Sequence, residues 1–194
     1  MSKKLYFGLF AGILFFLAIS TACYRGHTPK PRGYYRISFP EKKYLSFSGT
    51  CPYSFEYPVY GEVVKDDEKG SEPCWININF PAYNGTIHIS YKPVSNNLNS
   101  YLEDSYVLAY KHTVKAESIM EQLILNSDKN VYGILYDIEG STASSVQFFL
   151  TDSTQHFLRG ALYFRTAIDK DSLAPIIEFF REDVVHFINT FEWN

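Results

Sequence analysis

Apolar and polar residues alternate most regularly in two segments joined by a turn. Residues 76–80 read Ile-Asn-Ile-Asn-Phe, and residues 86–91 read Thr-Ile-His-Ile-Ser-Tyr. The segment 81–85 between them holds Pro, Asn and Gly, which favour a turn. Strict alternation predicts two strands of a hairpin, with one apolar face and one polar face.

Further short segments rich in β-branched and aromatic residues predict five more strands. They cover residues 53–60, 119–125, 130–138, 145–150 and 156–164. Pro58 cannot donate a backbone hydrogen bond, so the first of these strands should lie at a sheet edge or carry a bulge. The spacing of the last four strands predicts an antiparallel meander.

Two segments carry apolar residues at helical spacing. The first helix is predicted from residue 97 to about residue 115, and its inner face holds Leu98, Leu102, Ser105, Leu108, Ala109 and His112. The second follows a cap at Asp171 or Ser172, with Pro175 in its first turn and a wide apolar stripe up to Phe191.

The order of these elements is strand, hairpin, helix, four strands, helix. It predicts an α+β domain, with a mostly antiparallel sheet of about six to seven strands and two helices packed on that sheet.

The N-terminus has the layout of a secretory signal peptide. Lys3 and Lys4 precede an uncharged run over residues 5–19, and three small residues then lead to Cys23. A cysteine at this position is typical of a lipoprotein, which is cleaved before the cysteine and carries lipid on its thiol. An uncleaved membrane anchor is the alternative, because the run approaches the roughly 18–20 residues of a spanning helix.

This interpretation divides the chain into three parts. We expect a signal peptide over residues 1–22, the lipidated Cys23 with a tether over residues 23–50, and a single globular domain over residues 51–194. The tether is rich in proline and basic residues up to residue 40. Its basic side chains could contact anionic lipid headgroups or simply be solvated.

Removing Cys23 from the count leaves Cys51 and Cys74 as a pair. Export to an oxidising compartment favours a disulfide between them. A two-cysteine metal site is the alternative, but no histidine lies nearby at ligand spacing, so we expect no metal.

Charge argues against one class of partner. The chain has 18 basic and 21 acidic residues, for a net charge of -3. Without a basic excess to neutralise phosphates, nucleic acid is not an expected partner.

Known catalytic motifs do not occur in the sequence, and it suggests neither an enzyme nor a cofactor. The loose candidates lie on the first predicted helix: Glu103, Asp104, Ser105, Lys111 and His112. Ser105 and His112 are two turns apart, which is too far for a direct hydrogen bond from one helix. A solvated or capping role is the simpler interpretation, with a hydrolase as a rival.

The polar hairpin face is the candidate binding surface. It carries Asn77, Asn79 and His88, which could bind a sugar or a peptide strand or could simply be wet. Arg159 and Arg165 share a strand face; one could pair with Asp137, or the two could form an anion site.

Several long segments resemble one known family, the gliding motility lipoprotein GldD. They are Pro29-Lys-Pro-Arg-Gly-Tyr-Tyr-Arg, Cys51-Pro-Tyr-Ser-Phe-Glu-Tyr-Pro, Tyr101-Leu-Glu-Asp-Ser, Ala109-Tyr-Lys-His-Thr, Val131-Tyr-Gly-Ile-Leu-Tyr-Asp-Ile, Ser144-Ser-Val-Gln-Phe-Phe-Leu-Thr-Asp-Ser-Thr, Phe157-Leu-Arg-Gly-Ala-Leu-Tyr-Phe and Asp171-Ser-Leu-Ala-Pro. The resemblance covers nearly the whole chain after Cys23.

The resemblance implies a non-catalytic envelope protein of Bacteroidota that is required for gliding. It also implies a link to the type IX secretion machinery, with other envelope proteins of that machinery as partners and no catalytic residues to transfer. We expect a membrane-anchored lipoprotein that faces the periplasm, on the inner or the outer membrane. The order of strands and helices also resembles a PsbP-like α/β/α sandwich. A periplasmic ligand-binding module is the alternative function.

Overall fold

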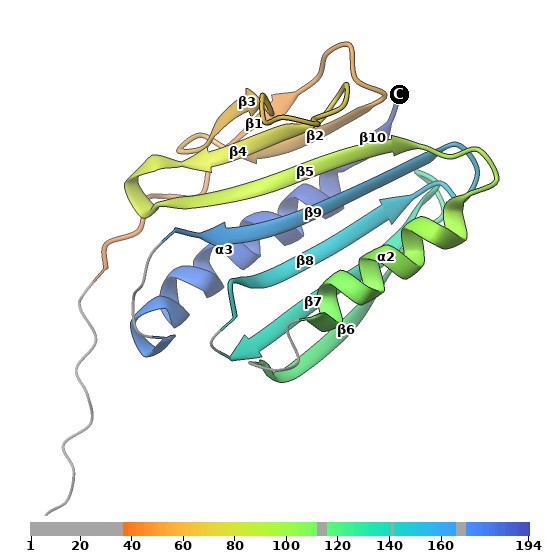
Figure 1. Ribbon diagram of the computed structural model, residues 1–194. Coiled ribbons are helices and arrows are strands. Elements are labelled where there is room, and N and C mark those ends of the chain that lie inside the picture. The colour runs from red at the N-terminus through yellow and green to blue at the C-terminus, as the bar shows by residue number, and fades with distance from the viewer. Residues whose placement is uncertain (1–36, 112–115, 141, 166–169) are drawn as a thin grey trace, which may run out of the picture. The chain divides into compact units, whose positions relative to one another are not determined.

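The computed structural model describes residues 37–111, 116–140, 142–165 and 170–194 (Figure 1). The expected signal peptide, Cys23, the first half of the tether (residues 23–36) and His112 lie outside these ranges. The side chains of the expected helix caps Asp171 and Ser172 are likewise not described.

Seven strands form one antiparallel sheet in the order β3-β4-β5-β9-β8-β7-β6. The strands are β3 (Glu62–Lys65), β4 (Ile76–Phe80), β5 (Gly85–Pro93), β6 (Ala116–Asn126), β7 (Val131–Gly140), β8 (Ser144–Thr151) and β9 (His156–Phe164). The predicted hairpin is β4–β5, in which Asn77 lies opposite His88. Its turn contains the short 3-10 helix η1 (Pro81–Tyr83), followed by Asn84 in the left-handed conformation, with φ of 50°.

The predicted meander runs from β6 to β9 and returns to the hairpin. Strand β9 pairs with β5 along its whole length, from His156 opposite Pro93 to Phe164 opposite Gly85. The connection from β5 to β6 contains helix α2 (Leu98–Tyr110). This crossover places two strands side by side that are more than 60 residues apart in the chain.

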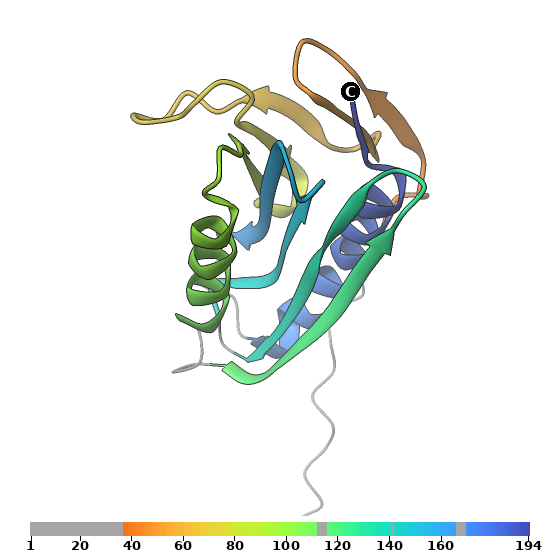
Figure 2. The ribbon, with the colours of Figure 1, turned by 90° about the vertical axis from the view of Figure 1, so that its right-hand side faces the viewer.

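The two helices cover opposite faces of the sheet (Figures 1 and 2). Helix α3 (Lys170–Thr190) covers the larger core, in which Phe148, Phe180 and Phe187 are almost fully buried. Helix α2 covers a smaller cluster that includes Ala109 and Phe157. Because α2 has only this cluster beneath it, part of its side of the sheet remains for polar residues.

A second, three-stranded sheet has the order β1-β2-β10. It consists of β1 (Tyr44–Phe47), β2 (Tyr53–Pro58) and β10 (Glu192–Trp193). Strand β2 is therefore central, and the expected edge position was wrong. Pro58 is tolerated because it is the last residue of β2, while the short β10 pairs only with Tyr53 and Ser54.

The expected fold class is confirmed: an α+β domain with a mostly antiparallel sheet and two helices packed on it. Strand β1 lies within the range that the sequence assigned to the tether. On α2, Ser105 and Ala109 face inward as expected, whereas Leu108 is 41% exposed.

Candidate functional site

The polar hairpin face expected from the sequence is present in the structure. Asn77, Asn79 and His88 lie on the α2 side of the sheet, opposite the isoleucines that face α3. His88 Nδ1 lies 2.7 Å from Asn77 Oδ1. Thr86 Oγ1 donates to Asn79 Oδ1 at 3.0 Å. The two amide oxygens are thus occupied, which holds the side chains in fixed positions.

His88 is half-buried, and its burial lowers the pKa of the imidazole from the ordinary value. The positive charge of Arg165 acts in the same direction, while Asp66 and Glu68 oppose it. The ring also meets the edge of Tyr163, with 5.5 Å between the ring centroids. These surroundings favour the neutral form of His88.

The polar face continues onto β9 and β8. Arg159 lies opposite Ser90 on β5, and Ala161 lies between His88 and Gln147. The Arg159 guanidinium donates through Nη2 to the side-chain oxygen of Gln147. The face therefore carries a cation near its centre.

The expected pairing of Asp137 with Arg159 or Arg165 was wrong. Asp137 accepts two hydrogen bonds from Arg181 of α3, both at 2.7 Å. Strand alternation explains the difference, because Asp137 points to the α3 side of the sheet, whereas Arg159 and Arg165 belong to the α2 side. In the described part of the chain, no ion pair includes Arg159.

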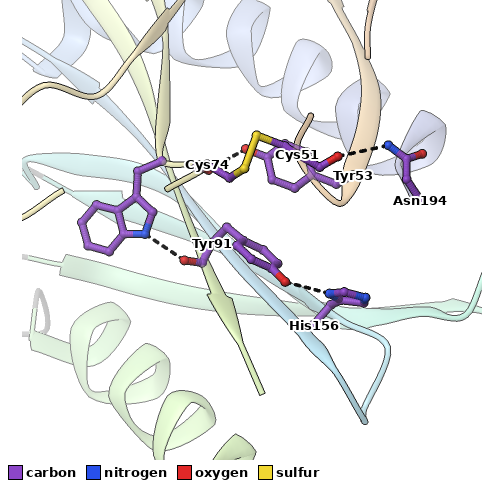
Figure 3. The surroundings of a disulfide bond; sticks show 7 residues. Cys51, Tyr53, Cys74, Tyr91, His156 and Asn194 are labelled. Atoms are coloured by element: carbon purple, nitrogen blue, oxygen red, sulfur yellow. Dashed lines mark hydrogen bonds between the residues drawn. A yellow bond between two sulfur atoms is a disulfide. The ribbon is translucent and has the colours of Figure 1, made fainter. Parts of the chain in front are cut away.

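A disulfide joins Cys51 to Cys74, as expected from the cysteine count (Figure 3). Cys51 precedes β2 and Cys74 precedes β4, so the bond ties the small sheet to the large one. Tyr53 donates its hydroxyl to the Cys74 carbonyl at 2.7 Å, and Asn194 Nδ2 donates to the Cys51 carbonyl at 3.3 Å. The disulfide thus has a structural role in holding the two sheets together.

The loose catalytic candidates on α2 are not brought together. Glu103, Asp104 and Lys111 are exposed, and Ser105 is buried against the sheet. His112 cannot be placed, because it lies outside the described residues. Within the described ranges, no three His, Cys, Asp or Glu side chains gather as metal ligands.

A second surface, which the sequence did not indicate, is the outer edge of the large sheet. Strand β6 ends the sheet order, and Met120, Leu123 and Leu125 on it are 54%, 65% and 69% exposed. The Tyr110 hydroxyl of α2 bonds to Glu121 of β6 at 2.9 Å, and Tyr106 stacks on Tyr110. We call β6 together with Tyr106 the apolar edge. The residue composition of 119–125 predicted a strand here but could not show that it lies at an edge.

Together these features define a disulfide-bridged α+β domain that presents one polar face and one apolar edge. Among the described residues, no helix is long and apolar enough to span a membrane. The family model of the gliding motility lipoprotein GldD matches residues 25–193. The chain therefore belongs to the GldD family of gliding motility lipoproteins, which implies association with the cell envelope.

A comparison with curated proteins found no match. Among solved structures, the chain is similar to the solution structure of cyanobacterial PsbP (CyanoP) from Synechocystis sp. PCC 6803. The sequence identity is 10%, the TM-score is 0.49, and the match covers 85% of this chain and 100% of that chain.

Proposed function

We propose that this protein is a non-catalytic accessory lipoprotein of the gliding and type IX secretion machinery. In this role, lipid on Cys23 holds the domain on a membrane, on the side facing the periplasm, and the domain docks onto another envelope protein. Membership of the family supports the link to gliding. The observation that carries the docking role is the apolar edge.

Exposed apolar side chains are concentrated around this edge. Nine large apolar residues are exposed among those described, and six of them belong to α2 or β6. They are Tyr106, Val107, Leu108, Met120, Leu123 and Leu125. Single exposed apolar residues are ordinary, but a concentration on neighbouring elements is typical of a protein interaction site.

The backbone of β6 offers a way to bind. This strand has 11 residues and pairs only with β7 in the described structure, so its outer backbone groups face away from the sheet. Long open edges in natural proteins are usually protected by proline, a bulge or charged side chains, above all lysine. Strand β6 contains neither proline nor lysine; its charges are Glu117 and Glu121, and its bulge lies at its start, between Ala116 and Ser118. The opposite edge, β3, has four residues and includes Lys65. The occupant that suits β6 is an extended segment of a partner, added as a further strand.

Two grooves beside β6 indicate which types of side chain such a partner segment would carry. Each has a volume of about 440 Å³ and lies between the β6–β7 hairpin and α3. One has Leu125, Val185 and Ile188 in its lining but exposes mainly polar groups, including those of Gln122, Asn126 and Asn189, so it suits a polar side chain.

The other groove contains Asp137, Glu139 and Glu178 around Ile177, with Arg181 as its basic residue. This excess of acidic groups suits a basic side chain. We therefore expect a partner segment with a polar residue at one end and a lysine or arginine at the other.

Deletion of the gene in the native host tests the role. Surface spreading and secretion of type IX cargo should be measured in the same strain, with the wild-type gene restored on a plasmid. Loss of either function, with recovery on complementation, supports the role. If the deletion strain spreads and secretes normally, the proposed role is wrong.

Complementation with edge variants tests the docking surface separately. Leu123→Lys together with Leu125→Lys should abolish spreading at normal protein abundance, because two charges block strand addition. Val64→Lys, at an exposed position of the opposite edge strand β3, is the matched control and should spread normally. Full spreading by the double variant would refute docking at β6 while leaving the role intact.

The lipid anchor has its own test. Cells treated with the signal-peptidase inhibitor globomycin should accumulate the unprocessed precursor, and Cys23→Ala should prevent acylation. If treated cells accumulate no precursor, the chain is not processed as a lipoprotein. A ligand-binding role for the polar face is a second candidate function, favoured by Arg159 on that face, a cation with no ion-pair partner among the residues that the structure describes.

A further inference from the structure

Arg159 lies at the boundary between two parts of the α2 side of the sheet. On one side, Phe157 belongs to the cluster beneath α2, where it contacts Tyr101 with 5.3 Å between the ring centroids. On the other side, Tyr163 and His88 belong to the polar face. The guanidinium therefore sits where helix cover ends and polar side chains begin.

This cation has no counter-charge among the described residues. Arg159 is partly buried, and burial lowers the pKa of its guanidinium. An arginine nevertheless stays protonated in proteins. A charge removed from water without a partner is costly, so buried arginines are normally paired. The carboxylate that the sequence offered, Asp137, is bound to Arg181 on the other side of the sheet.

The side-chain amide of Gln147, next to Arg159, also lacks part of its hydrogen bonding. A guanidinium only donates, so the amide must present its oxygen to Arg159 and its nitrogen elsewhere. That nitrogen is buried and has no hydrogen-bond partner, although Gln147 is only 1% exposed. The hydroxyl of Ser105, on the α2 face buried against this side of the sheet, has no partner either. A cation and two unsatisfied groups that can donate thus lie in the same layer.

The group that satisfies a guanidinium and an amide N–H together is an anionic oxygen. His88 is held neutral by its surroundings, so it adds no second positive charge at neutral pH. A single planar guanidinium with neutral neighbours matches a singly charged, planar anion better than a phosphate, which carries up to about two charges. We propose that Arg159 and Gln147 form a binding site for a carboxylate at the border of α2 and the polar face.

The carboxylate can belong to a small molecule or to the end of a peptide. In both cases two of its oxygens accept from Arg159, and one also accepts from the Gln147 amide. Ser90, opposite Arg159, and Tyr163 provide hydroxyl groups along the same face for the rest of the ligand.

Binding can be measured on the full-length protein in detergent by NMR of the arginine Nε–H signals. The probes are acetate, the peptide Gly-Gly-Ala with a free C-terminus, and the same peptide amidated. We expect saturable shifts of the Arg159 signal with acetate and the free peptide, and none with the amidated peptide. Tighter binding of the free peptide than of acetate, by tenfold or more, identifies a peptide end; equal affinity identifies a small carboxylate.

Two variants make the test specific. Arg159→Gln should abolish the response, while Arg165→Gln, an exposed arginine on the same strand face, should retain it. Gln147→Glu keeps the size of the side chain but brings a carboxylate of its own to Arg159. It should raise the melting temperature and abolish binding, a result that a loss of fold cannot imitate.

The site is refuted if neither acetate nor the free peptide causes a saturable shift, or if free and amidated peptides act alike. A lowered melting temperature for Gln147→Glu, with binding retained, would also refute it. These readouts use purified protein and do not depend on gliding, so they separate this site from the proposed function.

Discussion

The Lys42 ammonium lies 2.8 Å from Asp183 Oδ1, and this ion pair joins the segment before β1 to the middle of α3. Asp183 is 1% exposed, and its oxygens also accept from Tyr44 at 3.0 Å and from Tyr60 at 2.7 Å. Lys42 in addition donates to the Phe179 carbonyl and lies over the Phe179 ring. The buried Asp183 carboxylate thus holds the segment around Lys42 and Tyr44 against α3.

Asp183→Ala should destabilise the protein by about 3 kcal/mol, because it leaves a partly buried ammonium and two phenols without their acceptor. The measurement is urea unfolding of the full-length protein in detergent, followed by tryptophan fluorescence. Lys43→Met is the control. Lys43 pairs with Glu41 at the surface, so its loss should change stability by less than about 1 kcal/mol. Equal effects of the two substitutions would contradict a fastening role for Asp183.

The parts of the fold that the sequence predicted are those with long, regular patterns. The β4–β5 hairpin alternates over many residues, the strands of the meander are rich in β-branched and aromatic residues, and α3 carries a broad apolar face. By contrast, β1, β3 and β10 have two to four residues each. Such short strands form only because pairing with other strands stabilises them, so no local sequence pattern predicts them.

The residues of the candidate site likewise fall into those that the sequence could place together and those that it could not. Asn77 and His88 could be placed together because a hairpin sets their register. Arg159 could not be placed beside His88, because β9 pairs with β5 only after a crossover through α2 and three further strands. The partner of Asp137 was missed because Arg181 comes from a helix on the opposite side of the sheet from Arg159.

Gly160→Ala should destabilise the protein by about 1–3 kcal/mol through overpacking. A Cβ at Gly160 would lie 2.2 Å from the ring of Phe148, which is buried in the core on the α3 side. Phe148→Leu should therefore cost less in the Gly160→Ala background than in the wild type. Gly49→Ala, where no atom lies within 4 Å of the added Cβ, should be nearly neutral. Additive effects at Gly160 and Phe148 in the unfolding experiment would contradict the steric explanation.

Reduction of the Cys51–Cys74 bond should lower stability by about 3 kcal/mol, because the bond closes a loop with a sequence separation of 23. Urea unfolding with and without reductant measures the loss. The double variant Cys51→Ser with Cys74→Ser should match the reduced wild type and be insensitive to reductant. Alkylation of two thiols in the native, unreduced protein, seen by mass spectrometry, would show that the bond is not formed.

His88 should make the protein less stable as the pH falls below about 6.5, the ordinary histidine pKa. Burial lowers the pKa of His88 in the folded state, with Arg165 adding to the effect and Asp66 and Glu68 opposing it. The unfolded chain therefore binds this proton more readily, so the contribution is fully present above the unfolded pKa and is lost as the pH falls. His88→Gln, which keeps a polar side chain beside Asn77 but does not titrate in this range, should lose less stability between pH 7.5 and pH 5 than the wild type. An NMR titration that places the imidazole pKa at or above 6.5 would contradict the burial that the structure shows for this side chain.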